Sequence, residues 1–173
     1  MAGGCAGPGE QVAGGAEVLK KAVELTNIKT IFLDTAPIIY FIEGHPRFGE
    51  AVAGIVALFQ SGRCAAYSST VTLTEVLPVP VKLRKKDLAK KFVDFLLHGI
   101  NFNMLPISAE IAIRAGNLRG KYEALRSIDA IQIAAAMEVR ADVFLTNDKR
   151  LQQVKELAVW TVDDLAGLRL PRL

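Results

Sequence analysis

Four acidic residues stand in or beside apolar segments of this chain and are the first candidates for chemistry: Asp34, Glu75, Asp129 and Asp148. The clearest case is Asp129, since only Asp129 and Gln132 are polar between Ile128 and Ala136. Burying an uncompensated charge costs several kcal/mol or more. An acid in such a segment must therefore cap its helix, meet a cation or coordinate a metal.

Each acid also has a simple structural interpretation. Asp34 and Asp148 suit helix N-caps, because a carboxylate can accept from the first free backbone N–H groups. Asp129 suits the first turn of a helix, where the macrodipole favours negative charge, and Glu75 could pair with a basic neighbour. Taken singly, these roles do not explain why Glu75 and Asp129 lie inside apolar segments.

A shared site explains all four acids together. Three or four carboxylates on one rim repel one another unless cations hold them. Hard divalent cations with oxygen ligands, Mg²⁺ or Mn²⁺, fit such a set. The chain has two His and two Cys, and their spacing forms no competing zinc site.

The segments between the acids predict an α/β fold. Five short apolar runs predict buried strands, at residues 31–33, 64–67, 102–107, 143–145 and 159–162. Helical patterns cover residues 35–42, 48–60, 71–77, 82–98, 108–118, 127–136 and 148–156, with a last turn at 163–168. Apolar strands alternating with helices favour a three-layer α/β/α domain around a parallel sheet of four to five strands.

The order of these elements indicates where the acids lie. Asp34 and Asp148 directly follow strands, and Glu75 lies early in the helix after the second strand. In an open parallel sheet, the carboxyl ends of the strands and the following helix starts form the ligand-binding edge. Asp129 precedes the fourth strand, and strand order alone does not bring it to that edge.

The composition favours one soluble domain. We expect residues 1–27 to be a flexible Gly-rich leader with a short helix over 16–25, and residues 28–173 to form the domain. The chain is 51% apolar, which is ample for one core, yet no apolar run approaches the roughly 20 residues of a membrane span. With no secretory signal and no disulfide framework, a cytoplasmic location is expected.

The predicted helix over 82–98 is strongly basic. One interpretation is a solvated face, since long Lys side chains often cover helix surfaces. The other is an electrostatic contact with RNA phosphates. The candidate residues are Lys82, Lys85, Lys86 and Lys90. The residues just before this helix include Pro78 and Pro80, which we expect to end or kink the helix that carries Glu75.

Four motifs, taken in order, resemble the PIN-domain nucleases, and most closely the small VapC-type toxins of bacteria and archaea. They are Ile31–Thr35, Ser69–Leu77, Asp129–Ala134 and Thr146–Asp148, and the resemblance covers about residues 28–165. The leader and the two prolines depart from the smallest toxins, but neither touches the four acids.

This resemblance implies a strand order of 3-2-1-4-5 and a Mg²⁺- or Mn²⁺-dependent ribonuclease whose acidic quartet is Asp34, Glu75, Asp129 and Asp148. Thr146 matches a hydroxyl residue that supports the last acid without ligating the metal. It further implies an RNA substrate, a homodimer and a small antitoxin protein as partner.

Two alternatives to a nuclease follow from the same sequence. One is a PIN-fold module that binds RNA or a protein without cleaving, although all four acids are present. The other is a phosphotransferase of the haloacid-dehalogenase type. That class needs a second Asp two residues after the first, where this chain has Ala36, so it is disfavoured.

Overall fold

The computed structural model describes Leu25 and residues 27–165, and its centre is one parallel β-sheet. The strands are β1 (Thr30–Leu33), β2 (Ala65–Ser69), β3 (Phe102–Leu105), β4 (Val143–Thr146) and β5 (Val159–Thr161). They pair in the order β3-β2-β1-β4-β5, which is the order that the family resemblance implies. The expectations for residues 1–24, 26 and 166–168 lie outside the described residues.

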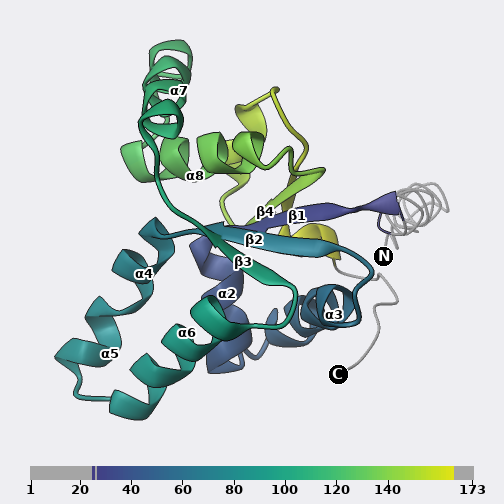
Figure 1. Ribbon diagram of the computed structural model, residues 1–173, viewed down its shortest axis with the longest axis vertical. Coiled ribbons are helices and arrows are strands. Elements are labelled where there is room, and N and C mark those ends of the chain that lie inside the picture. Colours follow the sequence, from purple (N-terminus) through teal and green to yellow (C-terminus); the bar gives the residue numbers. More distant parts are fainter. Residues whose placement is uncertain (1–24, 26, 166–173) are drawn as a thin grey trace, which may run out of the picture.

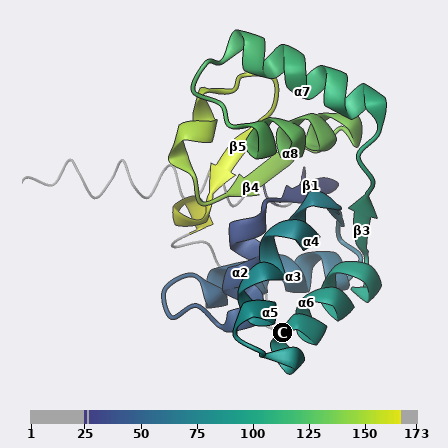
Figure 2. The same ribbon diagram turned by 90° about the vertical axis from the view of Figure 1, so that its left-hand side faces the viewer.

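Helices cover both faces of the sheet (Figure 1). One face carries α7 (Ala109–Lys121) and α8 (Ser127–Glu138), and the other carries α2 (Thr35–Glu43), α3 (Gly49–Gln60) and α6 (Lys86–His98). The short helices α4 (Val71–Val76) and α5 (Pro78–Lys82) lie beside α6 (Figure 2). The predicted three-layer α/β/α architecture is therefore confirmed. No helix in the described ranges has the length and apolar character to cross a membrane.

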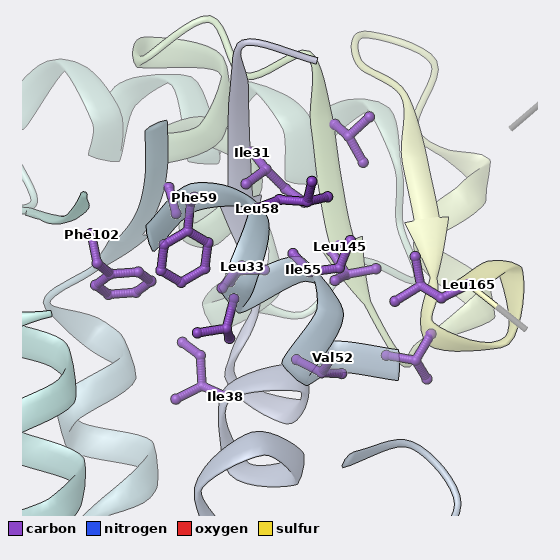
Figure 3. Packing of buried hydrophobic residues seen from close by; sticks show 14 of the residues in the cluster. Ile31, Leu33, Ile38, Val52, Ile55, Leu58, Phe59, Phe102, Leu145 and Leu165 are labelled. Carbon is purple, nitrogen blue, oxygen red and sulfur yellow. The ribbon is translucent and has the colours of Figure 1, made fainter. Parts of the chain in front are cut away.

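The strands divide the core into two clusters by the alternation of their side chains. Ile31 and Leu33 of β1 face α2 and α3, together with Leu145 of β4 (Figure 3). Phe32, between Ile31 and Leu33, and Phe144, next to Leu145, face α7 and α8. Their rings stack with centroids 5.6 Å apart. The near-continuous apolar strands thus serve two cores at once, as expected for a parallel sheet covered on both sides.

The segment after Glu75 differs from the expected single basic helix. Pro78 begins the separate helix α5 instead of only ending α4, because proline suits a first helical position where no N–H bond is needed. The helix predicted over 82–98 is wrong at its start. Arg84 adopts a left-handed backbone (φ 55°) after α5, and α6 begins only at Lys86.

Smaller differences concern the ends of other elements. The helix expected over 148–156 is a single 3₁₀ turn, η1 (Lys149–Gln153), and the expected terminal turn begins as η2 (Val162–Leu165). Strand β2 extends two residues beyond the predicted strand over 64–67 and ends with Ser68 and Ser69, whose hydroxyl side chains are fully buried. Their hydrogen bonds lead into the site described below.

We expect Phe144→Ala to lower the free energy of unfolding by about 3–5 kcal/mol, because it opens a cavity opposite Phe32. Chemical denaturation measures this change. The control Val81→Ala removes a side chain that is 65% exposed and should stay within about 0.5 kcal/mol of wild type. A similar small effect for both variants would contradict the assignment of Phe144 to the second core cluster.

Candidate active site at the carboxyl edge of the sheet

Asp34 lies at the end of the central strand and is held from two sides. Its carboxylate accepts from the backbone N–H of Thr35 (2.8 Å) and from the hydroxyl of Thr146 (2.6 Å). It is thus the N-cap of α2, as its simple structural interpretation requires. Burial nevertheless raises the pKa of Asp34 to about 6, against these two hydrogen bonds, and the negative charges of Glu75 and Asp129 add to the rise.

Glu75 lies at the same edge of the sheet as Asp34, and Thr35 connects the two side chains. The Thr35 hydroxyl donates to Glu75 Oε2 at 2.5 Å, while the Thr35 backbone N–H binds Asp34. One residue at the start of α2 therefore contacts both carboxylates. Among the described residues, no Lys, Arg or His forms an ion pair with Glu75. The basic neighbour that the structural interpretation of Glu75 requires is not found there.

Asp129 enters from the opposite face of the sheet. It occupies the first turn of α8 and is partly buried. Burial and the charge of Asp148 raise the pKa of Asp129, while the charges of Arg126 and Arg150 lower it. Glu75 also adds to the rise. Electrostatic interactions therefore connect Asp129 with each of the other three predicted acids at this edge of the sheet.

Asp148 is the one acid with a cation of its own. The Arg150 guanidinium donates from Nε to Asp148 Oδ1 (2.9 Å), and this hydrogen bond holds the pKa of Asp148 below its ordinary value. Asp148 also caps η1 through the backbone N–H of Arg150. Thr146 accepts from the Asp148 backbone N–H at 3.0 Å and donates to Asp34. Thr146 thus supports two acids, whereas the sequence linked it to the last one only.

Two basic residues of this site were not predicted from the sequence. Arg126 immediately precedes α8 and Arg150 lies in η1, and both have exposed side chains. The sequence feature that could have identified them is their position within three residues of Asp129 or Asp148. By contrast, the predicted Lys82, Lys85, Lys86 and Lys90 lie around the turn between α5 and α6, all exposed. Lys90 pairs with Asp94.

The donor chemistry of the edge fits a hard cation. It offers carboxylate and hydroxyl oxygens, and Asp34 is buried beside two like charges without an ion pair to any Lys, Arg or His in the described part of the chain. Within the described ranges, no three His, Cys, Asp or Glu side chains are grouped closely enough to form a metal cage. Mg²⁺ does not require one, since it is commonly held by one or two carboxylates together with waters and substrate phosphates.

Comparisons with known proteins concern the family and the fold of this chain. A family model described as PIN domain matches residues 31–157. The fold is similar to that of VapBC2 from Rickettsia felis bound to a DNA fragment from their promoter (TM-score 0.63, 20% identity, 76% of this chain and 98% of that chain). No curated protein sequence matches the chain.

Two further solved structures are similar. One is a toxin–antitoxin complex from Klebsiella pneumoniae (TM-score 0.55, 24% identity, 76% of this chain and 97% of that chain). The other is FitAcB from Neisseria gonorrhoeae (TM-score 0.59, 20% identity, 76% and 97%). Identities this low establish a common fold and nothing more.

The raised pKa of Asp34 has a consequence for stability without divalent cations. The folded state holds the Asp34 proton more tightly than the unfolded state, so this group favours folding below about pH 4 and the contribution is lost as the pH rises through about 6. We therefore expect Asp34→Asn to be more stable than wild type at about pH 7.5, by about 2 kcal/mol. The gain should vanish near pH 4.

Denaturation in a chelator at the two pH values measures this difference. Glu123→Gln, at an exposed carboxylate in the loop between α7 and α8, is the control and should show no such pH dependence. An Asp34→Asn variant that is less stable than wild type at both pH values would contradict the assignment.

Proposed function

Since this chain belongs to the PIN domain family, we propose that it is a Mg²⁺- or Mn²⁺-dependent endoribonuclease that hydrolyses RNA phosphodiester bonds. We further propose that it is the toxin of a toxin–antitoxin pair. The observation that carries the enzymatic proposal is the buried Asp34 carboxylate, which shares the sheet edge with Glu75 and Asp129 and has no cation of its own. A merely structural cap would not require two further carboxylates beside it.

Each acid has a distinct role in this proposal. Asp34 and Asp129 are the first choices for direct metal ligands, with Asp148 next, and Glu75 binds through water or orients the attacking water as a base. When bound, the cation supplies a lowered pKa for a coordinated water and stabilises the charge that develops on the phosphate. Thr35 and Thr146 hold the carboxylates in place through their hydroxyl groups.

The basic residues at the edge of the sheet supply the positive charge that RNA binding requires in this proposal. An acidic site repels a polyanion such as RNA, so positive charge must lie near it. Arg126 and Arg150 provide that charge, since both influence Asp129. The exposed lysines around the turn between α5 and α6 form a second basic surface, which we assign to phosphate contacts farther along the RNA.

The partner proposals rest on likeness of fold. The similar structure from K. pneumoniae is described as a toxin–antitoxin complex. By that likeness, we expect a small antitoxin protein as partner. We propose a homodimer as the assembly from the family resemblance, and a cytoplasmic location from the composition of the chain. Size-exclusion chromatography with light scattering tests the homodimer directly.

The activity test compares wild type with Asp34→Asn and Asp129→Asn on single-stranded and structured RNA. We expect Mn²⁺- or Mg²⁺-dependent cleavage by wild type and a loss of at least about 100-fold in each variant. A loss of cleavage by Asp34→Asn would not result from unfolding, because that variant should be at least as stable as wild type. Glu123→Gln should retain activity.

Equal cleavage by all these proteins would contradict the assignment. If wild type binds RNA but neither cleaves it nor binds Mn²⁺ in calorimetry, the chain is instead a binding module with this fold.

RNA binding in a chelator tests the two basic surfaces separately. Arg126→Gln should reduce the slope of log affinity against log salt by about 0.7, the value for one phosphate contact on a single strand. Combined replacement of Lys85, Lys86 and Lys90 by Gln should reduce it by about 2. Arg150 is left intact here, because its loss would also free Asp148. An unchanged slope in the triple variant would mean that the lysines only solvate their surface.

A further inference from the structure

Gln132 is a fully buried amide at the centre of a polar network beneath the acids. Its Oε1 accepts from the hydroxyl of Ser69 at the end of β2 (2.6 Å). Its Nε2 donates to the hydroxyl oxygen of Thr72 in α4 (2.8 Å) and lies 3.4 Å from that of Thr35 in α2. One side chain of α8 therefore reaches three other elements of the fold.

All members of this network are buried. Ser69 and Thr72 are fully buried, and Thr35 is 8% exposed. In the described part of the chain, no buried side-chain nitrogen or oxygen is left without a hydrogen-bond partner. An unpaired amide at this depth would be costly, so Gln132 is tolerated in an otherwise apolar helix because its partners are complete.

The chemistry of Glu75 sets the direction of these hydrogen bonds. An ionised carboxylate only accepts, so the Thr35 hydroxyl must give its proton to Glu75. The Thr35 oxygen can then act only as an acceptor toward Gln132. The amide NH₂ group of Gln132 must therefore face Thr35 and Thr72, and its oxygen must face Ser69. The Thr72 hydroxyl also shares a hydrogen bond with the Ser68 hydroxyl, 2.8 Å away, in which either oxygen can be the donor.

We infer that Gln132 is a positioning residue for the carboxylate site, which it acts on through Thr35 and Thr72. The Gln132 amide donates to the Thr35 hydroxyl oxygen, so the Thr35 hydroxyl donates its own proton to Glu75. Because Thr35 also binds Asp34 through its backbone N–H, the same contact helps to fix two acids. Gln132 lies three residues after Asp129, on the same side of α8, so it also locks the helix that carries the third acid.

This role differs from that of an ordinary buried amide. A core position between Ile131 and Ile133 is filled well by an apolar side chain of similar volume, and Met would serve packing alone. Only the hydrogen-bonding role requires an amide with one acceptor and two donors. The two roles therefore separate when Gln132 is replaced by Met.

The inference rests on the proposed function for its metal readout, so the test has two arms. In the first, calorimetry measures Mn²⁺ binding to wild type and Gln132→Met. We expect the dissociation constant to rise roughly 10–100-fold, as for other residues that orient metal ligands. Ile133→Val, a buried change on the same helix that makes no polar contact, should leave it unchanged.

A matched pair at Thr72 guards against misfolding of Gln132→Met. Thr72→Val removes the hydroxyl that Gln132 binds and should weaken Mn²⁺ binding, while Thr72→Ser keeps the hydroxyl and should restore it. Thr72 makes no hydrogen bond to any of the four acids among the described contacts; its hydroxyl contacts Gln132 and lies 3.5 Å from the Thr35 hydroxyl oxygen. A loss in Thr72→Val therefore reaches the acids only through Gln132 and Thr35.

The second arm needs no metal. Crystal structures of metal-free wild type and Gln132→Met, or Thr72→Val if the first does not fold, are expected to differ in the side-chain positions of Thr35 and Glu75. Unmoved side chains together with unchanged Mn²⁺ affinity would overturn the inference. If wild type itself binds no Mn²⁺, the proposed function fails, and the crystal comparison alone decides the role of Gln132.

Discussion

The buried carboxylate of Asp34 is the constraint on which the rest of this site depends. Two short hydrogen bonds, from the Thr35 backbone and the Thr146 hydroxyl, favour its charged form. Burial and two neighbouring acids outweigh them, because the pKa of Asp34 still lies at about 6. The fold therefore contains a carboxylate, Asp34, whose charged form it destabilises. This is a common feature of functional sites, where stability is given up for a charge arrangement that a ligand later completes.

Two threonines hold acids from different elements of the fold in fixed positions relative to one another. Thr146 donates to Asp34 and accepts from the Asp148 backbone, so it links the ends of β1 and β4, which pair directly. Thr35 links Asp34 to Glu75 across α2 and α4. Thr146 uses its hydroxyl both as donor and as acceptor, whereas Thr35 uses its backbone N–H and its hydroxyl. Each pair of acids is thereby fixed by one short connection. Such compact connections tolerate little displacement of the strands beneath them.

The sheet and most of the edge could be predicted from sequence, because apolar runs mark strands and the residue after a strand lies at a known end. That reasoning covers Asp34 and Asp148 directly. It does not cover Asp129, because α7 and α8 both intervene between β3 and β4, and sequence order does not say which helix start returns to the edge. The role of Ser69 could not be predicted for a related reason, because its partner, Gln132, is 63 residues away. Local patterns carry no information about a contact made only by folding.

The four acids are not equivalent, and the difference has a physical consequence. Arg150 already compensates Asp148 and lowers its pKa, whereas Asp34 is raised by burial and by its acidic neighbours. When the pKa values of neighbouring carboxyl groups are shifted in opposite directions, chemically identical side chains take different roles in a site. A divalent cation bound as we propose would relieve the most repulsion at Asp34, Glu75 and Asp129, and the least at Asp148. The side of the edge formed by β1, α4 and α8 is therefore where a cation gains the most, while the η1 side retains an arginine suited to a phosphate.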